Sequence, residues 1–145
     1  MNPNIEFSIK TAQAYSAMCK PLCQELKLPQ TAFDILMFLA NNPDCTTARD
    51  IVEIRKIKAN LVSVNVDRLV QEGYLLRQPA PGDRRKCRLV CTEKAGPVVQ
   101  QGRELQETFF RRLARGLEPE DLAAFRRCLE GFRRNLSQMT QEDAQ

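Results

Sequence analysis

The sequence of 145 residues contains no histidine. This absence removes Ser-His and Cys-His catalytic pairs, mixed Cys/His zinc sites and the usual general base near neutral pH. No apolar run approaches the roughly 18 residues of a membrane-spanning helix. The sequence also lacks a Cys-x-x-Cys pair, internal repeats and low-complexity segments. We therefore expect neither an enzyme nor a membrane protein, and no catalytic residue, resident metal or cofactor.

Six cysteines are the remaining candidates for a reactive or metal-binding group. Residues 1–10 lack the basic start and apolar core of a secretory signal, so we expect a cytoplasmic protein with reduced thiols. Cys19 and Cys23 lie one turn apart on an expected helix. They either pack in the helix interface, which is the more common role, or serve as a redox or thiophilic-metal site. Cys87 and Cys91 lie about 13 Å apart along an expected strand, too far to share an ion, and should pack as small apolar residues.

Positive charge is concentrated in the middle of the chain. The formal net charge is +4, but residues 55–94 hold ten Lys or Arg and four Asp or Glu and therefore carry +6. The rest of the chain carries −2. Such a basic segment is typical of proteins that bind polyanions, although a solvated basic face would look the same. The densest part is GDRRKCRLVC (82–91), which places Arg84, Arg85, Lys86 and Arg88 within five positions.

Hydrophobic spacing predicts a mainly α-helical chain with one β-hairpin. Pro21 is expected to kink or divide the first helix, and the almost continuously apolar segment 31–40 should be buried on most sides. An apolar stripe runs from Leu122 to Leu136 at alternating spacings of three and four residues, as in a coiled coil. The expected helices are 5–27, 31–40, 46–57, 58–73, 93–115 and 122–136, and the expected strands are 74–78 and 86–92, joined by a turn at 79–83.

The order of these elements is that of a helix–turn–helix followed by a hairpin wing. Thr46 or Thr47 should cap the short helix 46–57, and Gly73 should end the helix that follows it. A helix fits the major groove of DNA, and its exposed N-terminal side chains can read base edges. A basic hairpin tip can reach phosphates or enter the minor groove, where the negative potential favours arginine. The pattern therefore predicts a DNA-binding protein.

Four segments resemble the MarR family of bacterial winged helix–turn–helix transcription regulators. DRRKCRLVCTEKA (83–95) is similar to the wing signature of that family, in which Asp-Arg-Arg precedes alternating apolar residues and a Thr-Glu-Lys-Gly-like helix start. Three further segments resemble the junction of the first two helices, the recognition helix with the first strand, and the start of the final helix. They are KPLCQELKLPQTAFDILMFLA (20–40), KANLVSVNVDRLVQEGYLLR (58–77) and GLEPEDLAAFRRCL (116–129).

This resemblance implies a homodimer that binds a palindromic operator, most simply a repressor that a small-molecule effector releases. It implies a helical dimerisation region in residues 1–28 and 97–145 and a winged helix–turn–helix DNA-binding domain in residues 29–96. Arg85 would enter the minor groove and Asp83 would fix its orientation. The remaining DNA contacts that it implies are Arg84 and Lys86 beside the wing tip, Lys58, Asn60, Leu61, Ser63 and Val64 on the recognition helix, and Arg68 at a phosphate.

The sequence leaves several alternatives open. Leu61 and Val64 stand where the family often has small polar or basic residues, so they either touch thymine methyl groups or widen the local core. Tyr15 and Phe38 either line the ligand cleft of the family or only pack in the core. A redox- or metal-responsive regulator that uses Cys19 and Cys23 is the alternative function. A thiol enzyme and a winged helix that binds protein are two further classes, and the basic segment disfavours the second.

Overall fold

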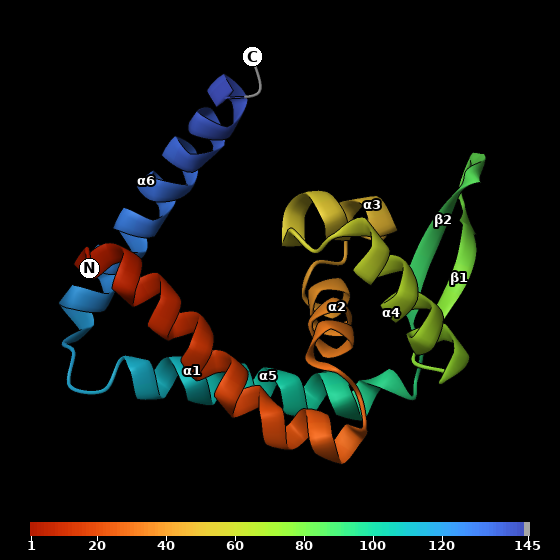
Figure 1. Cartoon of the computed structure of the whole chain (residues 1–145), viewed down its shortest axis with the longest axis horizontal. Coiled ribbons are helices and arrows are strands. Elements are labelled where there is room, and N and C mark those ends of the chain that lie inside the picture. Colours follow the sequence, from red (N-terminus) through yellow and green to blue (C-terminus); the bar gives the residue numbers. More distant parts are fainter. Residues whose placement is uncertain (144–145) are drawn as a thin grey trace. The chain divides into compact units, whose positions relative to one another are not determined.

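The structure is a computed structural model that describes residues 1–143, apart from the side chain of Arg84. It consists of helices and one two-stranded antiparallel sheet (Figure 1). It divides into two compact units, Met1–Phe109 and Phe110–Gln145. The mainly α-helical fold with a hairpin wing is confirmed. The elements are α1 (Pro3–Leu26), α2 (Gln30–Asn41), α3 (Ala48–Asp50), the π-helix η1 (Ile51–Arg55), α4 (Ala59–Gln71), β1 (Leu75–Ala80), β2 (Asp83–Cys91), α5 (Ala95–Leu113) and α6 (Pro119–Asp143).

Helix α2 forms the centre of the first unit because its sequence is apolar almost without interruption. Helices α1 and α4, η1 and strand β2 all pack against it. On the side of α5, Gly102 approaches α2 so closely that a Cβ atom there would collide with Met37 and touch Phe33. The burial expected for this segment is confirmed. Its buried residues are Ala32, Phe33, Ile35, Leu36, Met37, Phe38 and Leu39.

Helix α1 is a single helix, so of the two outcomes expected at Pro21, a kink or a division, the division does not occur. The proline is exposed, whereas Cys19 and Cys23 on either side of it are buried in the core. Packing of this buried face holds the helix together despite the backbone hydrogen bond that a proline cannot donate. Lys27 ends the helix in the left-handed conformation, with φ of 55°, and turns the chain towards α2.

The helix–turn–helix follows from local capping and from one apolar face. Thr47 caps α3 with a reciprocal capping box: its side chain accepts from the backbone N–H of Asp50, whose carboxylate accepts from the N–H of Thr47. The turn before α4 is made at Lys56, which has φ of 63°. Helix α4 buries the face predicted from the spacing of Val62, Val66 and Leu69, together with Asn65, and the chain turns at Gly73 with φ of 86°.

The wing is an antiparallel hairpin of β1 and β2 that rises beside α4, with its tip pointing away from α5 (Figure 1). The turn is shorter than predicted, because only Pro81 and Gly82 lie between the strands. Gly82 has φ of 82°, which permits a tight turn after a proline. At the other edge of β2, the N–H of Leu89 donates to the carbonyl of Thr46 at 2.7 Å. This bond joins the wing to the chain segment before α3.

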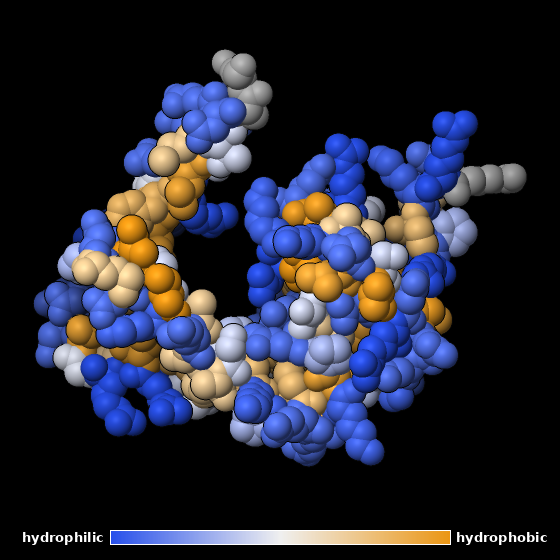
Figure 2. All heavy atoms as spheres, viewed as in Figure 1, coloured by the Kyte–Doolittle hydropathy of each residue, from blue (hydrophilic) through white to orange (hydrophobic). Residues whose placement is uncertain are grey.

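The second unit contains the end of α5 and helix α6, separated by a turn at Gly116, which has φ of 82°. The predicted stripe lies on α6 but is not buried within the chain. Apolar spheres follow this helix on the face shown in Figure 2. Apart from the half-buried Leu122, the stripe and its continuation are exposed: Phe125, Leu129, Phe132, Leu136 and Met139.

Candidate nucleic-acid interface

The face of α4 opposite the core carries the residues expected to read DNA bases. Lys58 is the N-cap of the helix, and Asn60 and Ser63 are exposed within it. Leu61 and Val64 are also exposed, by 42% and 66%. These two side chains therefore do not widen the core. Of the two alternatives that the sequence left open for them, contact with thymine methyl groups is the one that remains. The face combines two small polar groups with two large apolar ones.

Arg68 is exposed, but its guanidinium is bound within the protein. Its Nη2 donates to the backbone carbonyl of Lys27 at 2.8 Å, and its Nε donates to Glu72 at 3.3 Å. The first of these bonds joins the C-terminal half of α4 to the turn between α1 and α2. The family resemblance implies a phosphate contact for Arg68, and no local pattern points to this bond, because its partner is a backbone atom 41 residues away.

The tip of the wing is organised around Asp83. Its Oδ1 accepts a 2.9 Å hydrogen bond from the backbone N–H of Arg85. The pairing of the strands is irregular here, since Pro79 pairs with Cys87 while Ala80 pairs with Asp83. Residues 84–86 of the described backbone therefore have no partner in β1. This irregularity moves the three basic positions out of the regular ladder, as bulges commonly do.

The side chains at the tip are free to extend, because little of the wing packs against the body. Arg85, Lys86 and Arg88 are exposed, and Cys87 is exposed as well. The expectation that Cys87 is packed is therefore wrong: the tip extends beyond the core, which ends at Leu89 and the half-buried Cys91. Arg84 is a further expected contact, but its side chain lies outside what the structure describes.

Part of the positive charge of residues 55–94 is neutralised by carboxylates of the protein itself. Arg55 forms an ion pair with Asp34 at 3.3 Å, and Arg77 pairs with Asp67. Burial raises the pKa of Asp34, and the nearby Arg55 partly offsets this rise. The charge that remains for an anionic partner is accordingly concentrated at the wing tip and at the start of α4.

Two residues after the wing tie it to the end of α4. Thr92 Oγ1 donates to the carbonyl of Gly73 at 2.6 Å. Lys94 Nζ donates to the carbonyl of Glu72 at 2.6 Å and lies 4.6 Å from the centre of the Tyr74 ring. These donors satisfy carbonyl groups that a helix end leaves without partners. The role of the Thr-Glu-Lys segment depends on carbonyl groups about 20 residues earlier in the chain, so no local pattern indicates it.

The cysteines of α1 are close together but buried. Burial raises the pKa of Cys19, and it raises the pKa of Cys23 to about 11. A thiol with a raised pKa is little ionised near neutral pH and reacts slowly. Within residues 1–143, no three His, Cys, Asp or Glu residues are grouped as a metal site requires. This environment favours a packing role for Cys19 and Cys23.

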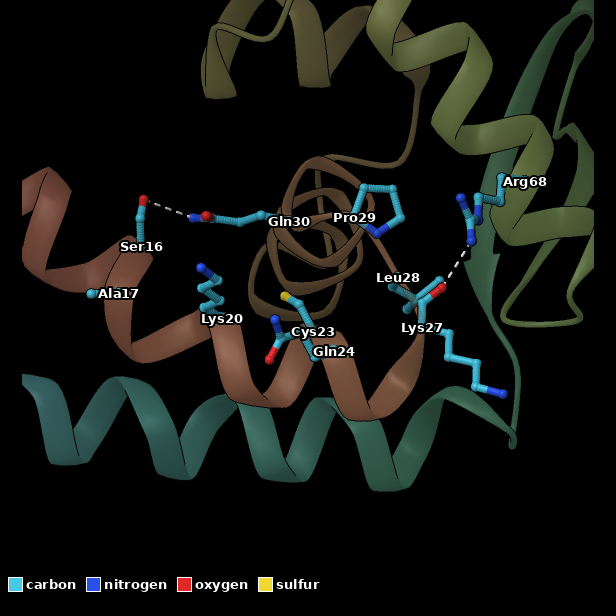
Figure 3. A pocket seen from close by; sticks show the side chains of 10 residues that line it. All are labelled: Ser16, Ala17, Lys20, Cys23, Gln24, Lys27, Leu28, Pro29, Gln30 and Arg68. Carbon is cyan, nitrogen blue, oxygen red and sulfur yellow. Dashed lines mark hydrogen bonds between the residues drawn. The ribbon is translucent and has the colours of Figure 1, made fainter.

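A pocket of about 640 Å³ lies where α1, the start of α2 and Arg68 of α4 meet (Figure 3). Lys20 and Arg68 bring positive charge to it, whereas the Lys27 side chain points away from it. No Asp or Glu is among its lining residues. These residues are Ser16, Ala17, Lys20, Cys23, Gln24, Lys27, Leu28, Pro29, Gln30 and Arg68.

A second, smaller pocket of about 190 Å³ contains both aromatic residues suggested for a ligand cleft, Tyr15 and Phe38. The Tyr15 hydroxyl accepts from Gln106 at 3.0 Å, and its ring meets that of Phe109 edge to face. Burial raises the pKa of Tyr15 to about 12. The ion pair of Asp34 and Arg55 also lines this pocket.

The short capped helix, the turn at Lys56, the exposed face of α4 and the basic hairpin define a winged helix–turn–helix protein. Residues 26–86 match the model of the MarR family. The resemblance seen in the sequence is thus confirmed for the segment that contains the helix–turn–helix and the wing tip. No curated protein matches the chain. In the part of the chain that the structure describes, no helix has the length and apolar character needed to cross a membrane.

Solved structures share this fold along nearly the whole chain. The transcriptional regulator SlyA is 20% identical, with a TM-score of 0.80 over 95% of this chain and 96% of SlyA. MarR from E. coli is 18% identical, with a TM-score of 0.71 over 91% of this chain and 98% of MarR. A MarR-family regulator from Listeria monocytogenes, in complex with 26mer DNA, is 16% identical, with a TM-score of 0.82 over 95% of this chain and 91% of that protein.

Proposed function

We propose that this protein is a MarR-type transcription regulator that binds double-stranded DNA. The observation that carries the proposal lies in the first unit, where the exposed face of α4 stands beside the β-hairpin. Residues 84–86 of this hairpin have no partner in β1, and all three are basic. The same fold occurs in the Listeria regulator that was solved with DNA. The protein would act on chromosomal DNA in the cytoplasm, and we assign it no catalytic step.

In this proposal α4 enters the major groove and the wing tip reaches the minor groove. Arg85 inserts into the minor groove, while Asp83 holds the backbone of Arg85 through the 2.9 Å hydrogen bond. Lys86 and Arg84 contact phosphates beside the tip. Lys58, Asn60 and Ser63 contact bases or phosphates from the start of α4. Contacts to phosphate make the affinity sensitive to salt, because each neutralised phosphate releases counterions.

The decisive experiment selects bound sequences from a random pool of duplex DNA and then measures affinity for the selected site. Arg85→Ala should weaken binding and lower the salt dependence. Arg127→Ala removes the same charge from an exposed position on α6 and serves as the control. Selection of no sequence from the pool would overturn the proposal. Equal affinity of the two variants and the wild type at moderate salt would overturn the role of Arg85.

We propose further that the protein acts as a homodimer on a palindromic site. The support is the exposed apolar stripe of α6, which a second copy could cover through its own identical stripe. Apolar residues at the start of α1, Ile5, Phe7 and Ile9, are also exposed. Light scattering should give twice the mass of the chain. Replacing Leu129 and Phe132 together by Glu should give a monomer with intact helical circular dichroism, and a wild-type monomer would overturn the proposal.

We also propose that the protein is a repressor whose effector is an amphipathic anion bound in the pocket of about 640 Å³. Its volume lies in the range of small-molecule sites. Lys20 and Arg68 would attract the negative group, and the apolar part of the ligand would contact Leu28 and Pro29. Because Arg68 belongs to α4, occupation of the pocket would bias the position of the helix that reads DNA.

The effector proposal is tested with a panel of aromatic carboxylates and their neutral amides. The acids should raise the melting temperature of the protein and release the selected DNA, while the amides should not. Lys20→Ala should abolish this response, whereas Lys10→Ala, which lies outside the pocket on the same helix, should retain it. Equal responses of the two variants would place the effector elsewhere.

A further inference from the structure

We infer that Leu61 and Val64 read thymine through its C5-methyl group and thereby set the sequence preference of the protein. The inference rests on the proposed DNA-binding function and adds the chemistry of the site that is recognised. Both side chains are on the exposed face of α4, one helical turn apart, since residues i and i+3 are neighbours on a helix surface.

The two side chains have no role in the folded chain that explains their exposure. The buried face of α4 is complete without them, as Val62, Val66 and Leu69 are all in the core. Asn65, the buried amide of this helix, donates to the backbone carbonyl of Leu61 at 2.7 Å and is therefore turned towards the helix itself. The exposed face is left with two apolar groups beside the small polar side chains of Asn60 and Ser63.

The methyl group of thymine is the largest apolar group that the four bases offer on their major-groove edges. Apart from small C–H groups, such as the C5–H of cytosine, the other groups on these edges donate or accept a hydrogen bond. A leucine or valine placed against such a group would remove it from water without replacing the bond, which is unfavourable. Leu61 and Val64 can therefore favour thymine by contact and also disfavour the other bases by desolvation. Asn60 and Ser63 would contact the neighbouring base edges.

The surroundings of the two side chains identify the occupant of this face as DNA rather than an apolar protein surface. Lys58 stands at the N-cap of the same helix, and the following hairpin presents Arg85, Lys86 and Arg88. An apolar protein partner would have to remove these cations from water, whereas phosphates on either side of a groove would pair with them. A protein surface with apolar side chains at its centre and cations around them complements a major groove, in which base edges lie between two rows of phosphates.

The test replaces single thymines of the selected site by uracil. This change removes the methyl group and leaves every hydrogen-bonding group of the base in place. For wild-type protein, uracil should weaken binding about threefold to fivefold at one or two positions in each half-site, as expected for the loss of one buried methyl group. The measurement is the equilibrium affinity at one fixed salt concentration.

The assignment to residues follows from variants measured on the same DNA. Leu61→Ala should abolish the difference between thymine and uracil at one position, and Val64→Ala should do so at a neighbouring position. Gln71→Ala, at another exposed position of α4, should leave the differences unchanged. Circular dichroism and the unfolding midpoint of each variant should equal those of the wild type, since the replaced side chains lie outside the core.

The two proposals fail in different ways. Sites that are bound tightly but show no effect of uracil at any position would overturn the thymine inference and leave the DNA-binding function standing. Retention of the full uracil effect in both Leu61→Ala and Val64→Ala would also overturn it. Absence of any selected sequence would instead remove the proposed function.

Discussion

The guanidinium of Arg68 holds the backbone carbonyl of Lys27 at 2.8 Å. Through this bond helix α4, which we propose to face DNA, is tied to the turn at the end of α1. Lys27 is in the left-handed conformation, which directs its carbonyl towards α4 instead of along the axis of α1. The bond therefore depends on the geometry of the turn and not on the identity of the Lys27 side chain.

We expect Arg68→Ala to lower the free energy of unfolding by about 0.5–1 kcal/mol. The effect is small because hydrogen bonds to water in the unfolded chain replace most of what an exposed, charged hydrogen bond contributes to the folded protein. Arg77→Ala, which removes the exposed ion pair with Asp67, should cost less. Urea unfolding of both variants measures the difference. If Arg68 acts only at a phosphate, Arg68→Ala would leave stability unchanged and reduce the salt dependence of DNA binding by about one counterion.

The hydrogen bond from the Arg85 backbone to Asp83 should position the wing tip without contributing much to global stability. Asp83→Ala should weaken binding to the selected DNA about twofold to tenfold, the range for loss of one hydrogen bond. Asp83→Asn keeps an acceptor oxygen and should bind nearly as well as the wild type. Comparable losses in both variants would show that the negative charge of Asp83, and not its hydrogen bond, is what matters.

Gly102 should be intolerant of any side chain, because a Cβ atom there would collide with Met37 and press against Phe33. Gly102→Ala is expected to destabilise the protein by about 1–3 kcal/mol, as is usual for overpacking of a core. Gly96→Ala is the matched control in the same helix, since nothing lies within 4 Å of its Cβ position. This second change should stabilise the protein slightly through better helix propensity, by up to about 1 kcal/mol. Thermal unfolding of both variants decides the point.

Stability should decrease in alkaline solution. Burial raises the pKa of Cys23 from 9.0 to about 11 and that of Tyr15 from 10.0 to about 12. The unfolded chain therefore loses these protons at lower pH than the folded protein does, and the free energy of unfolding falls as the pH rises above 9. Unfolding curves between pH 8 and 11 measure the decline. Cys23→Ala should reduce its slope, whereas replacement of the exposed Cys128 should not.

Local sequence patterns were sufficient to predict most elements of this fold. The spacing of Val62, Val66 and Leu69 correctly indicated the buried face of α4, and Thr47 was one of the two expected caps of α3. Gly73, which was expected to end a helix, adopts positive φ directly after α4. Each of these features depends on residues within a few positions of one another, so that backbone sterics and helical periodicity are enough to specify it.

The wing shows where such patterns stop being informative. Cys87 and Cys91 lie on one strand as predicted, but burial along that strand ends at Leu89, so that Cys87 is exposed. A pattern of alternation indicates which residues share a face and not how far the opposing core extends. Likewise, the unpaired residues 84–86 result from the register of two strands, which no single strand specifies.

The sequence by itself determined a helix–turn–helix with a basic wing, because those elements arise from local propensity and from clustered charge. The tertiary structure alone decided what several of the singled-out side chains contact. Arg68 donates to the carbonyl of Lys27, and Arg55 pairs with Asp34. Cys19 and Cys23 are buried, whereas Leu61 and Val64 are exposed to solvent. The physical reason is that burial, desolvation and long-range hydrogen bonds depend on which distant segments pack together, and chain order does not encode this directly.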